Sequence, residues 1–191
     1  MVRNRAYAYD TTAPPYTNEG AGRVYGLELL LKARFGEKFF GWVAYTYQRA
    51  FRTDYPGEVE RPFDFDQPHL LTVLGTWTFN PRWSLGGRFR LVSGNPTTPV
   101  TGSLLDASSG TYVPLYGAVN TERLPAFAQF DVRVDRTWTF RTWKLGLYLD
   151  VQNATNRANA EGYSYNYDYS APPQPVTGLP ILPILGVQGE W

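Results

Sequence analysis

Seven stretches of this 191-residue chain alternate polar and apolar side chains with a period of two, which is typical of β-strands with one apolar face. They span 23–35, 39–51, 69–79, 83–93, 126–140, 143–153 and 185–191. The connections between them alternate in length, from two or three residues to fifteen or more. This pattern predicts an antiparallel meander in which all tight turns lie at one end and all long loops at the other.

The long connections are rich in proline, glycine, asparagine and acidic residues, which predicts loops. We predict loops at 11–22, 52–68, 94–125 and 154–180. Residues 1–10 also alternate, but this piece is too short and too polar to be a full strand.

Three architectures accommodate such a meander: a soluble sandwich with 185–191 as an edge strand, a soluble closed barrel, and an outer-membrane β-barrel. A soluble sandwich has no reason to sort its loops by length between its two ends, and long loops are uncommon in compact domains. Outer-membrane barrels have short periplasmic turns and long extracellular loops. Each stretch offers about ten alternating residues, which matches a tilted membrane-crossing strand of about 9–11 residues. The pattern therefore favours an all-β, antiparallel transmembrane barrel.

Aromatic residues support the membrane interpretation, because they make up 16% of the chain and gather at the tight-turn end of the predicted strands. The members of this group are Phe35, Phe39, Phe40, Phe79, Trp83, Trp138, Phe140, Trp143 and Trp191. Tryptophan and other aromatic side chains form girdles where the apolar surface of a barrel meets the lipid headgroups.

The face opposite the apolar side chains carries many charges. Its charged residues are Glu28, Lys32, Arg34, Arg88, Arg90, Asp131, Arg133, Asp135, Lys144 and Asp150. This face is too charged to be the core of a soluble barrel, but it fits the polar interior of a membrane barrel. We interpret Arg88, Arg90, Asp131, Arg133 and Asp135 as a charge network in the lumen rather than as a ligand site.

Composition excludes several classes of function. The net charge of +1 gives no basis for nucleic-acid binding. The chain has no cysteine and a single histidine, His69, which we interpret as a residue at the start of a strand, not a metal ligand. We expect no cofactor, no metal and no catalytic residue, and hence no enzyme.

Two further expectations concern membrane helices and the two ends of the chain. No stretch is apolar enough for a membrane helix, and the first seven residues lack the apolar segment of a signal peptide, so an exported chain would lack its own beginning. The final stretch places Leu185, Val187, Gly189 and Trp191 on one face and ends on an aromatic residue. We interpret these four residues as the signal that the barrel-assembly machinery reads on a closing strand.

Four motifs, taken in order, resemble the TonB-dependent outer-membrane receptors. Residues 22–29 read Gly-Arg-Val-Tyr-Gly-Leu-Glu-Leu, and 66–69 read Asp-Gln-Pro-His before a strand. Residues 93–96 read Ser-Gly-Asn-Pro, and 150–156 read Asp-Val-Gln-Asn-Ala-Thr-Asn. The terminal aromatic strand completes a resemblance that covers essentially the whole chain.

The resemblance implies a barrel of about 22 strands plugged by an N-terminal domain, which imports siderophores or other large nutrients with energy from TonB. The chain would be the last seven or eight strands, without the plug and the TonB-binding segment, and would not transport by itself. Its implied partners are outer-membrane lipid, the assembly machinery, and TonB only through the missing plug region. Candidate substrate contacts are Tyr163, Tyr165, Tyr167, Tyr169, Asp64 and Asp66. The alternative is that these residues belong to extracellular loops with no substrate role.

Two other functions remain open. The chain could be a self-contained small barrel with a structural or adhesive role, in which 1–10 would pair with 185–191. It could also be a soluble sandwich or a lipid-binding barrel, which solubility without detergent would reveal.

Overall fold

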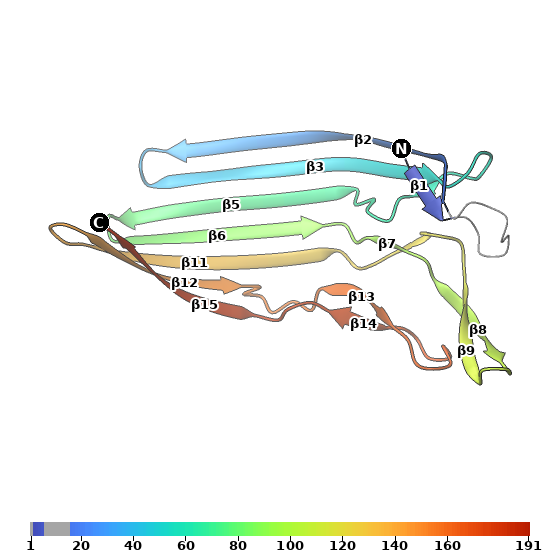
Figure 1. Ribbon diagram of the computed structural model, residues 1–191. Coiled ribbons are helices and arrows are strands. Elements are labelled where there is room, and N and C mark those ends of the chain that lie inside the picture. Colours follow the sequence, from blue (N-terminus) through green and yellow to red (C-terminus); the bar gives the residue numbers. More distant parts are fainter. Residues whose placement is uncertain (1, 6–15) are drawn as a thin grey trace.

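The computed structural model describes residues 2–5 and 16–191, and its long strands form one curved antiparallel sheet (Figure 1). The long strands are β2 (Tyr16–Phe35), β3 (Phe39–Thr53), β5 (His69–Asn80), β6 (Trp83–Val92), β11 (Phe127–Thr139), β12 (Lys144–Gln152) and β15 (Leu182–Glu190). The short β1 (Val2–Arg5) pairs with β2, and β4 (Arg61–Pro62) pairs with β3. The strand order β1-β2-β3-β5-β6-β11-β12-β15 confirms the predicted all-β meander.

The tight turns all lie at one end of the sheet, on the left of Figure 1, together with the C-terminus. Gly36 adopts a φ of 57° in the turn between β2 and β3, a conformation that glycine tolerates without steric cost. In the turn between β5 and β6, the Asn80 side-chain oxygen accepts hydrogen bonds from the amides of Arg82 and Trp83, at 2.9 and 3.1 Å. Because these turns depend on local interactions, the sequence predicts their positions.

Strand register places like side chains next to one another across the sheet. Val73, Phe89 and Phe130 stand in one row, and Arg88 stands opposite Asp131 in the next. Because side chains alternate along a strand, the sheet has an apolar face and a polar face. These are the two faces that the period-two pattern predicts.

The predicted loop at 11–22 is wrong for its second half, because β2 begins at Tyr16. The reason is pairing on both sides: Gly20 stands opposite Val2 of β1, and Gly22 stands opposite Arg52 of β3. Neighbouring strands satisfy the backbone groups of a segment whose composition suggested a loop. Residues 6–15 lie outside the described part of the chain.

The predicted loop 52–68 contains the two-residue β4, and two other predicted loops contain paired strands of their own. Within 94–125, β8 (Val100–Asp106) and β9 (Thr111–Tyr116) form a hairpin, and β7 (Pro96–Thr97) pairs with β10 (Glu122–Arg123). Within 154–180, β13 (Ala160–Ser164) pairs with β14 (Gln174–Thr177). Composition did not predict these hairpins, because the turn residues around them outnumber the short runs of strand-forming residues.

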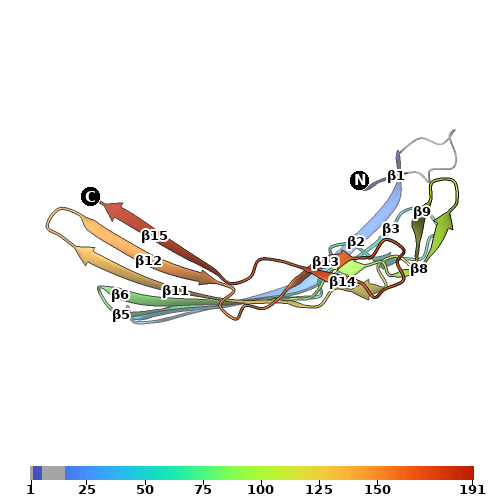
Figure 2. The same cartoon turned by 90° about the horizontal axis from the view of Figure 1, so that it is seen from below.

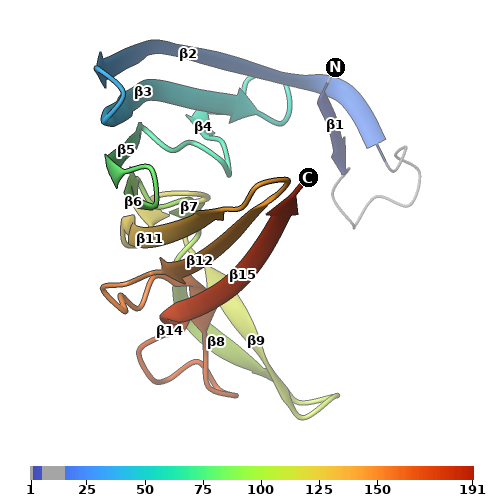
Figure 3. The same ribbon diagram turned by 90° about the vertical axis from the view of Figure 1, so that its left-hand side faces the viewer.

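Seen from its tight-turn end, the sheet is an open arc (Figure 3), and the view from below shows that strands also bend along their length (Figure 2). β15 pairs with β12 at one edge, and no strand of residues 2–5 or 16–191 pairs with its other edge. The small-barrel alternative needed 1–10 to pair with 185–191, whereas Val2–Arg5 pairs with β2. The described residues include no helix with the length and hydropathy needed to cross a membrane.

Candidate functional site

The polar face holds a buried carboxylate at its centre. Asp131 is 5% exposed, and its Oδ2 accepts hydrogen bonds from Nε and Nη2 of Arg88, at 2.8 and 2.6 Å. Its Oδ1 accepts from the Gln129 side chain at 2.7 Å and from the Asn153 amide at 2.9 Å. A carboxylate with four donors is fully satisfied, so this cluster joins β6, β11 and the end of β12 as a structural unit.

A second ion pair lies further along β11. Arg133 donates from Nη2 to Oδ1 of Asp135 at 2.7 Å, and its guanidinium lies 3.9 Å from the ring centre of Tyr148 on β12. Arg90 differs, because it pairs with no carboxylate among the described residues. It makes a long contact of 3.4 Å with Gln129 and lies 5.1 Å from the ring centre of Phe127.

The five residues predicted as a charge network therefore form two ion pairs and leave one arginine without a carboxylate. A hollow of about 250 Å³ adjoins these pairs, and the residues that line it include Arg88, Asp131, Arg133, Asp150 and Gln152. Charges of both signs that neutralise one another suit a hydrated wall better than a site for one charged ligand.

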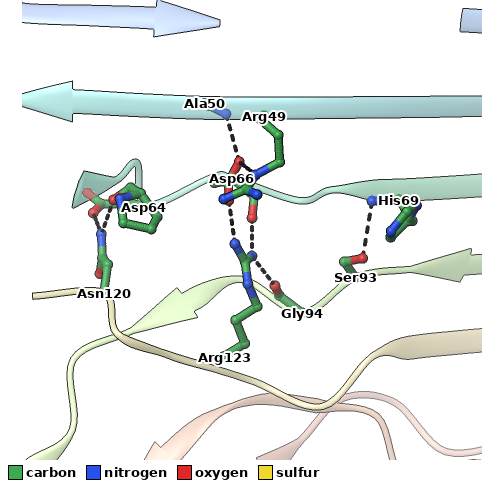
Figure 4. A network of polar contacts seen from close by, with 10 residues as sticks. Arg49, Ala50, Asp64, Asp66, His69, Ser93, Gly94, Asn120 and Arg123 are labelled. Carbon is green, nitrogen blue, oxygen red and sulfur yellow. Dashed lines mark hydrogen bonds and ion pairs between the residues drawn. The ribbon is translucent and has the colours of Figure 1, made fainter. Parts of the chain in front are cut away.

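The loops at the opposite end from the tight turns are joined by Asp66 (Figure 4). Its side chain is completely buried and accepts hydrogen bonds from the Ala50 amide at 2.7 Å, from Arg49 at 3.3 Å and from Arg123. Arg123 also donates to the backbone oxygens of Asp66 and Gly94. Burial raises the pKa of Asp66, but the hydrogen bonds from Ala50, Arg123 and Arg49 outweigh it and hold the pKa below its usual value.

Asp66 was a candidate for substrate contact, but its carboxylate is enclosed by these loop contacts and offers no surface to a ligand. Asp64 differs, since 60% of its side chain is exposed. The Asn120 amide donates to Asp64 at 2.7 Å and to the Pro62 carbonyl at 2.9 Å, which fastens the loop 52–68 to the loop 94–125 (Figure 4).

Sequence reasoning missed Asn120, Arg123 and Asn159. Asn159 is 6% exposed, and its side chain accepts from the amide of Ala128 and donates to the carbonyl of the same residue, both at 2.9 Å. It thus replaces a missing strand neighbour at the end of β11. Of these three residues, Asn120 alone gives a local signal through its residue type. Asparagine adopts a positive φ more readily than most residues, and the φ of Asn120 is 59°.

The four candidate tyrosines belong to the β13–β14 hairpin, which touches the β8–β9 hairpin. The rings of Tyr167 and Tyr112 meet edge to face at 5.9 Å, and the Ser103 hydroxyl donates to the Asp168 carbonyl at 2.6 Å. The rings of Tyr165 and Tyr169 lie 5.6 Å apart, and Tyr163 lies within β13 itself. Tyr167 is 81% exposed, so this pair of hairpins offers an aromatic surface at the long-loop end of the sheet.

The remaining predicted residues lie at the two ends of the strands. Leu185 and Val187 are each 69% exposed on β15, and Trp191 is 96% exposed directly after it. A methyl group at Gly189 would lie 3.6 Å from the Trp191 ring, so the ring lies above this glycine.

His69 begins β5, and its Nδ1 lies 2.8 Å from the Tyr45 hydroxyl. No group of three histidine, aspartate or glutamate side chains in the described part of the chain is placed to hold a metal ion.

Comparison with known families agrees with this geometry. The family model described as TonB dependent receptor-like, beta-barrel matches residues 2–154, which is most of the chain and includes three of the four motifs and part of the fourth. No curated protein and no solved structure matches the chain. Members of the family are transporters of the Gram-negative outer membrane and are not enzymes. The two-faced sheet with sorted turns and loops, together with this match, shows that the chain belongs to the TonB-dependent receptor β-barrel family.

Proposed function

We propose that the chain forms the C-terminal strands of a TonB-dependent receptor barrel that takes up a siderophore or another large nutrient. The observation that carries this proposal is the curved sheet with one apolar face, one charged face and an edge at β15 with which no strand of residues 2–5 or 16–191 pairs. Only a closed sheet satisfies every backbone group in hydrocarbon, so an open arc with an apolar face requires further strands. About 22 strands complete such a receptor.

In this barrel the apolar face contacts lipid and the polar face lines the lumen. The Arg88–Asp131 and Arg133–Asp135 pairs then act as a neutral, hydrated part of the inner wall. Such a wall does not retain a charged ligand strongly, because each charge already has its partner.

The ligand contact belongs to the outer end of the proposed barrel, at the paired β8–β9 and β13–β14 hairpins. Tyr112 and Tyr167 present aromatic rings there, and Asp64 presents a carboxylate in the neighbouring loop. Tyrosine combines a large apolar surface with a polar tip and has few rotatable bonds, which suits the binding of a large, partly polar ligand. Asp66 has a different role in this proposal and fixes the loops that carry these residues.

The partners follow from the same arrangement. Lipid contacts the apolar face, the barrel-assembly machinery reads Leu185, Val187, Gly189 and Trp191, and TonB acts through the plug region of the receptor. The exposure of this terminal face supports its recognition during assembly.

Uptake by cells tests the proposal. Cells that express the receptor containing this chain, with and without a functional TonB system, are supplied with iron-labelled siderophores and labelled cobalamin. We expect accumulation of one of these compounds only when TonB is functional. Changing both Tyr112 and Tyr167 to alanine should raise the half-saturating concentration about thirtyfold, since each ring contributes about 1 kcal/mol and about 1.4 kcal/mol corresponds to tenfold. The matched control is Tyr116→Ala, which removes an exposed tyrosine from the same hairpin. Accumulation that does not depend on TonB would contradict the proposal.

A further inference from the structure

Arg136 places a cation on the apolar face of β11, near the tight-turn end of the sheet. In the register it stands opposite Trp83 of β6 and Leu147 of β12, and it shares its face with Val134 and Trp138. Trp83 is the first residue of β6, so Arg136 lies at the border of the apolar band and not in its middle. The alternation of polar and apolar residues does not account for a charge at this position.

The guanidinium of Arg136 packs against two tryptophan rings. Its Cζ lies 4.8 Å from the ring centre of Trp83 and 4.6 Å from that of Trp138. Its buried Nε has no hydrogen-bond partner, and no carboxylate of residues 19–191 forms an ion pair with it. Arg88 and Arg133 on the polar face, in contrast, each have an aspartate.

We propose that Arg136 binds the phosphodiester group of a phospholipid in the periplasmic leaflet of the outer membrane. The proposal rests on the membrane placement given under the proposed function. The tryptophan rings lie over the guanidinium carbon, and the Nη groups donate to no carboxylate of the described residues, which leaves them for a two-pronged interaction with phosphate oxygens. Tryptophans prefer the depth of the headgroups, which is where that phosphate lies.

Electrostatics at this edge favour an anionic headgroup. Arg82 and Arg141 lie exposed in the two turns beside Arg136, and neither forms an ion pair with a carboxylate of the described residues. Basic side chains that cluster near a membrane surface attract anionic lipids. A bound phosphate also supplies the counter-charge that an arginine at the apolar border lacks.

Lipid binding by the purified receptor that contains this chain tests the inference. The receptor is extracted from outer membranes, stripped of lipid in mild detergent and titrated with phosphatidylglycerol, with native mass spectrometry as the readout. The comparison lipid is a galactolipid with the same acyl chains and no phosphate. We expect about tenfold tighter binding of phosphatidylglycerol, because charge-assisted hydrogen bonds to one phosphate are worth this much. Arg136→Met should abolish the preference, and Arg136→Lys should keep part of it.

Two control variants separate binding at Arg136 from a general attraction of the lipid to basic side chains. Arg141→Met removes a nearby cation without tryptophan contacts and should leave most of the preference. Trp138→Leu keeps the cation and removes one ring, so it should weaken binding even if Arg136→Met does not fold. Folding of each variant is followed by its heat-dependent migration on a gel.

Several results would overturn the inference. These are equal binding of both lipids by the unaltered chain, an unchanged preference in folded Arg136→Met, and displacement of the lipid by millimolar inorganic phosphate, which would indicate a site for free anions. A chain that never reaches the outer membrane would overturn the proposed membrane placement as well, whereas a chain that reaches it without the lipid preference overturns this inference alone.

Discussion

Arg123 donates hydrogen bonds to both the carboxylate and the backbone oxygen of Asp66, which lies 57 residues earlier in the chain. The pair joins the loop 52–68 to the loop 94–125 beside β3, whose Ala50 amide donates to the same carboxylate (Figure 4). Its carboxylate is completely buried, whereas the arginine is 32% exposed. This pair therefore fixes the two loops relative to each other and to β3.

Arg123→Met should loosen these loops without unfolding the sheet. Removing the donor leaves a buried carboxylate with fewer partners, which costs roughly 1–3 kcal/mol. We expect faster cleavage within 94–125 when intact cells are treated with protease. The control is Arg23→Met, which removes an exposed pair with Glu60 and should have almost no effect. Equal cleavage of both variants would contradict the role given to Arg123.

The stability of the loops should depend on pH through Asp66. Its pKa in the folded chain lies below the usual value of 3.8, so the unfolded loops bind the proton more readily than the folded ones. The stabilisation is complete above about pH 4 and is lost as the pH falls through the lower, folded pKa. Hydrogen exchange of the loop amides at pH 6 and near pH 3 measures this loss. In Asp66→Asn the corresponding change should be absent, and an equal change in both proteins would rule out this carboxylate as its origin.

Adjacent residues of β11 test which face meets lipid. Val132→Arg should destabilise the folded chain by roughly 2–4 kcal/mol, because it places a charge in the middle of the apolar band. Arg133→Val should cost only about 1 kcal/mol, since Asp135 is 33% exposed and can be hydrated instead. Urea unfolding in lipid vesicles measures both values. Similar losses for the two variants would refute the assignment of the faces.

Removal of Trp191 should impair assembly but not the stability of the folded chain. Its side chain is 96% exposed and lies over Gly189, so its loss should change the free energy of unfolding by less than about 0.5 kcal/mol. If the assembly machinery reads this residue, the amount of folded chain in the outer membrane should fall several-fold. Leu104→Ala, an exposed apolar residue of β8, is the control. An unchanged yield in the outer membrane would exclude Trp191 from the signal.

Much of the sheet was predictable because its causes are local. Successive side chains of a strand, such as Val132 and Arg133, point to opposite faces, and this alternation is a local property of the extended backbone. The turns at Gly36 and Asn80 depend on backbone freedom and on hydrogen bonds within three residues. The start of β2 at Tyr16 was not predictable in this way, because its pairing with β1 and β3 outweighs the composition of the segment.

The sequence by itself determined the seven long strands apart from where some of them begin, the two faces, the sorting of short turns and long connections, and the family. Only the tertiary structure decided that Asp66 meets Arg123, that Asn159 completes the end of β11, and that Arg136 packs against Trp83 and Trp138. The physical reason is the range of the interactions. Side-chain alternation and turn chemistry act over a few residues, whereas the partner of a polar side chain depends on strand register and on the path of distant loops.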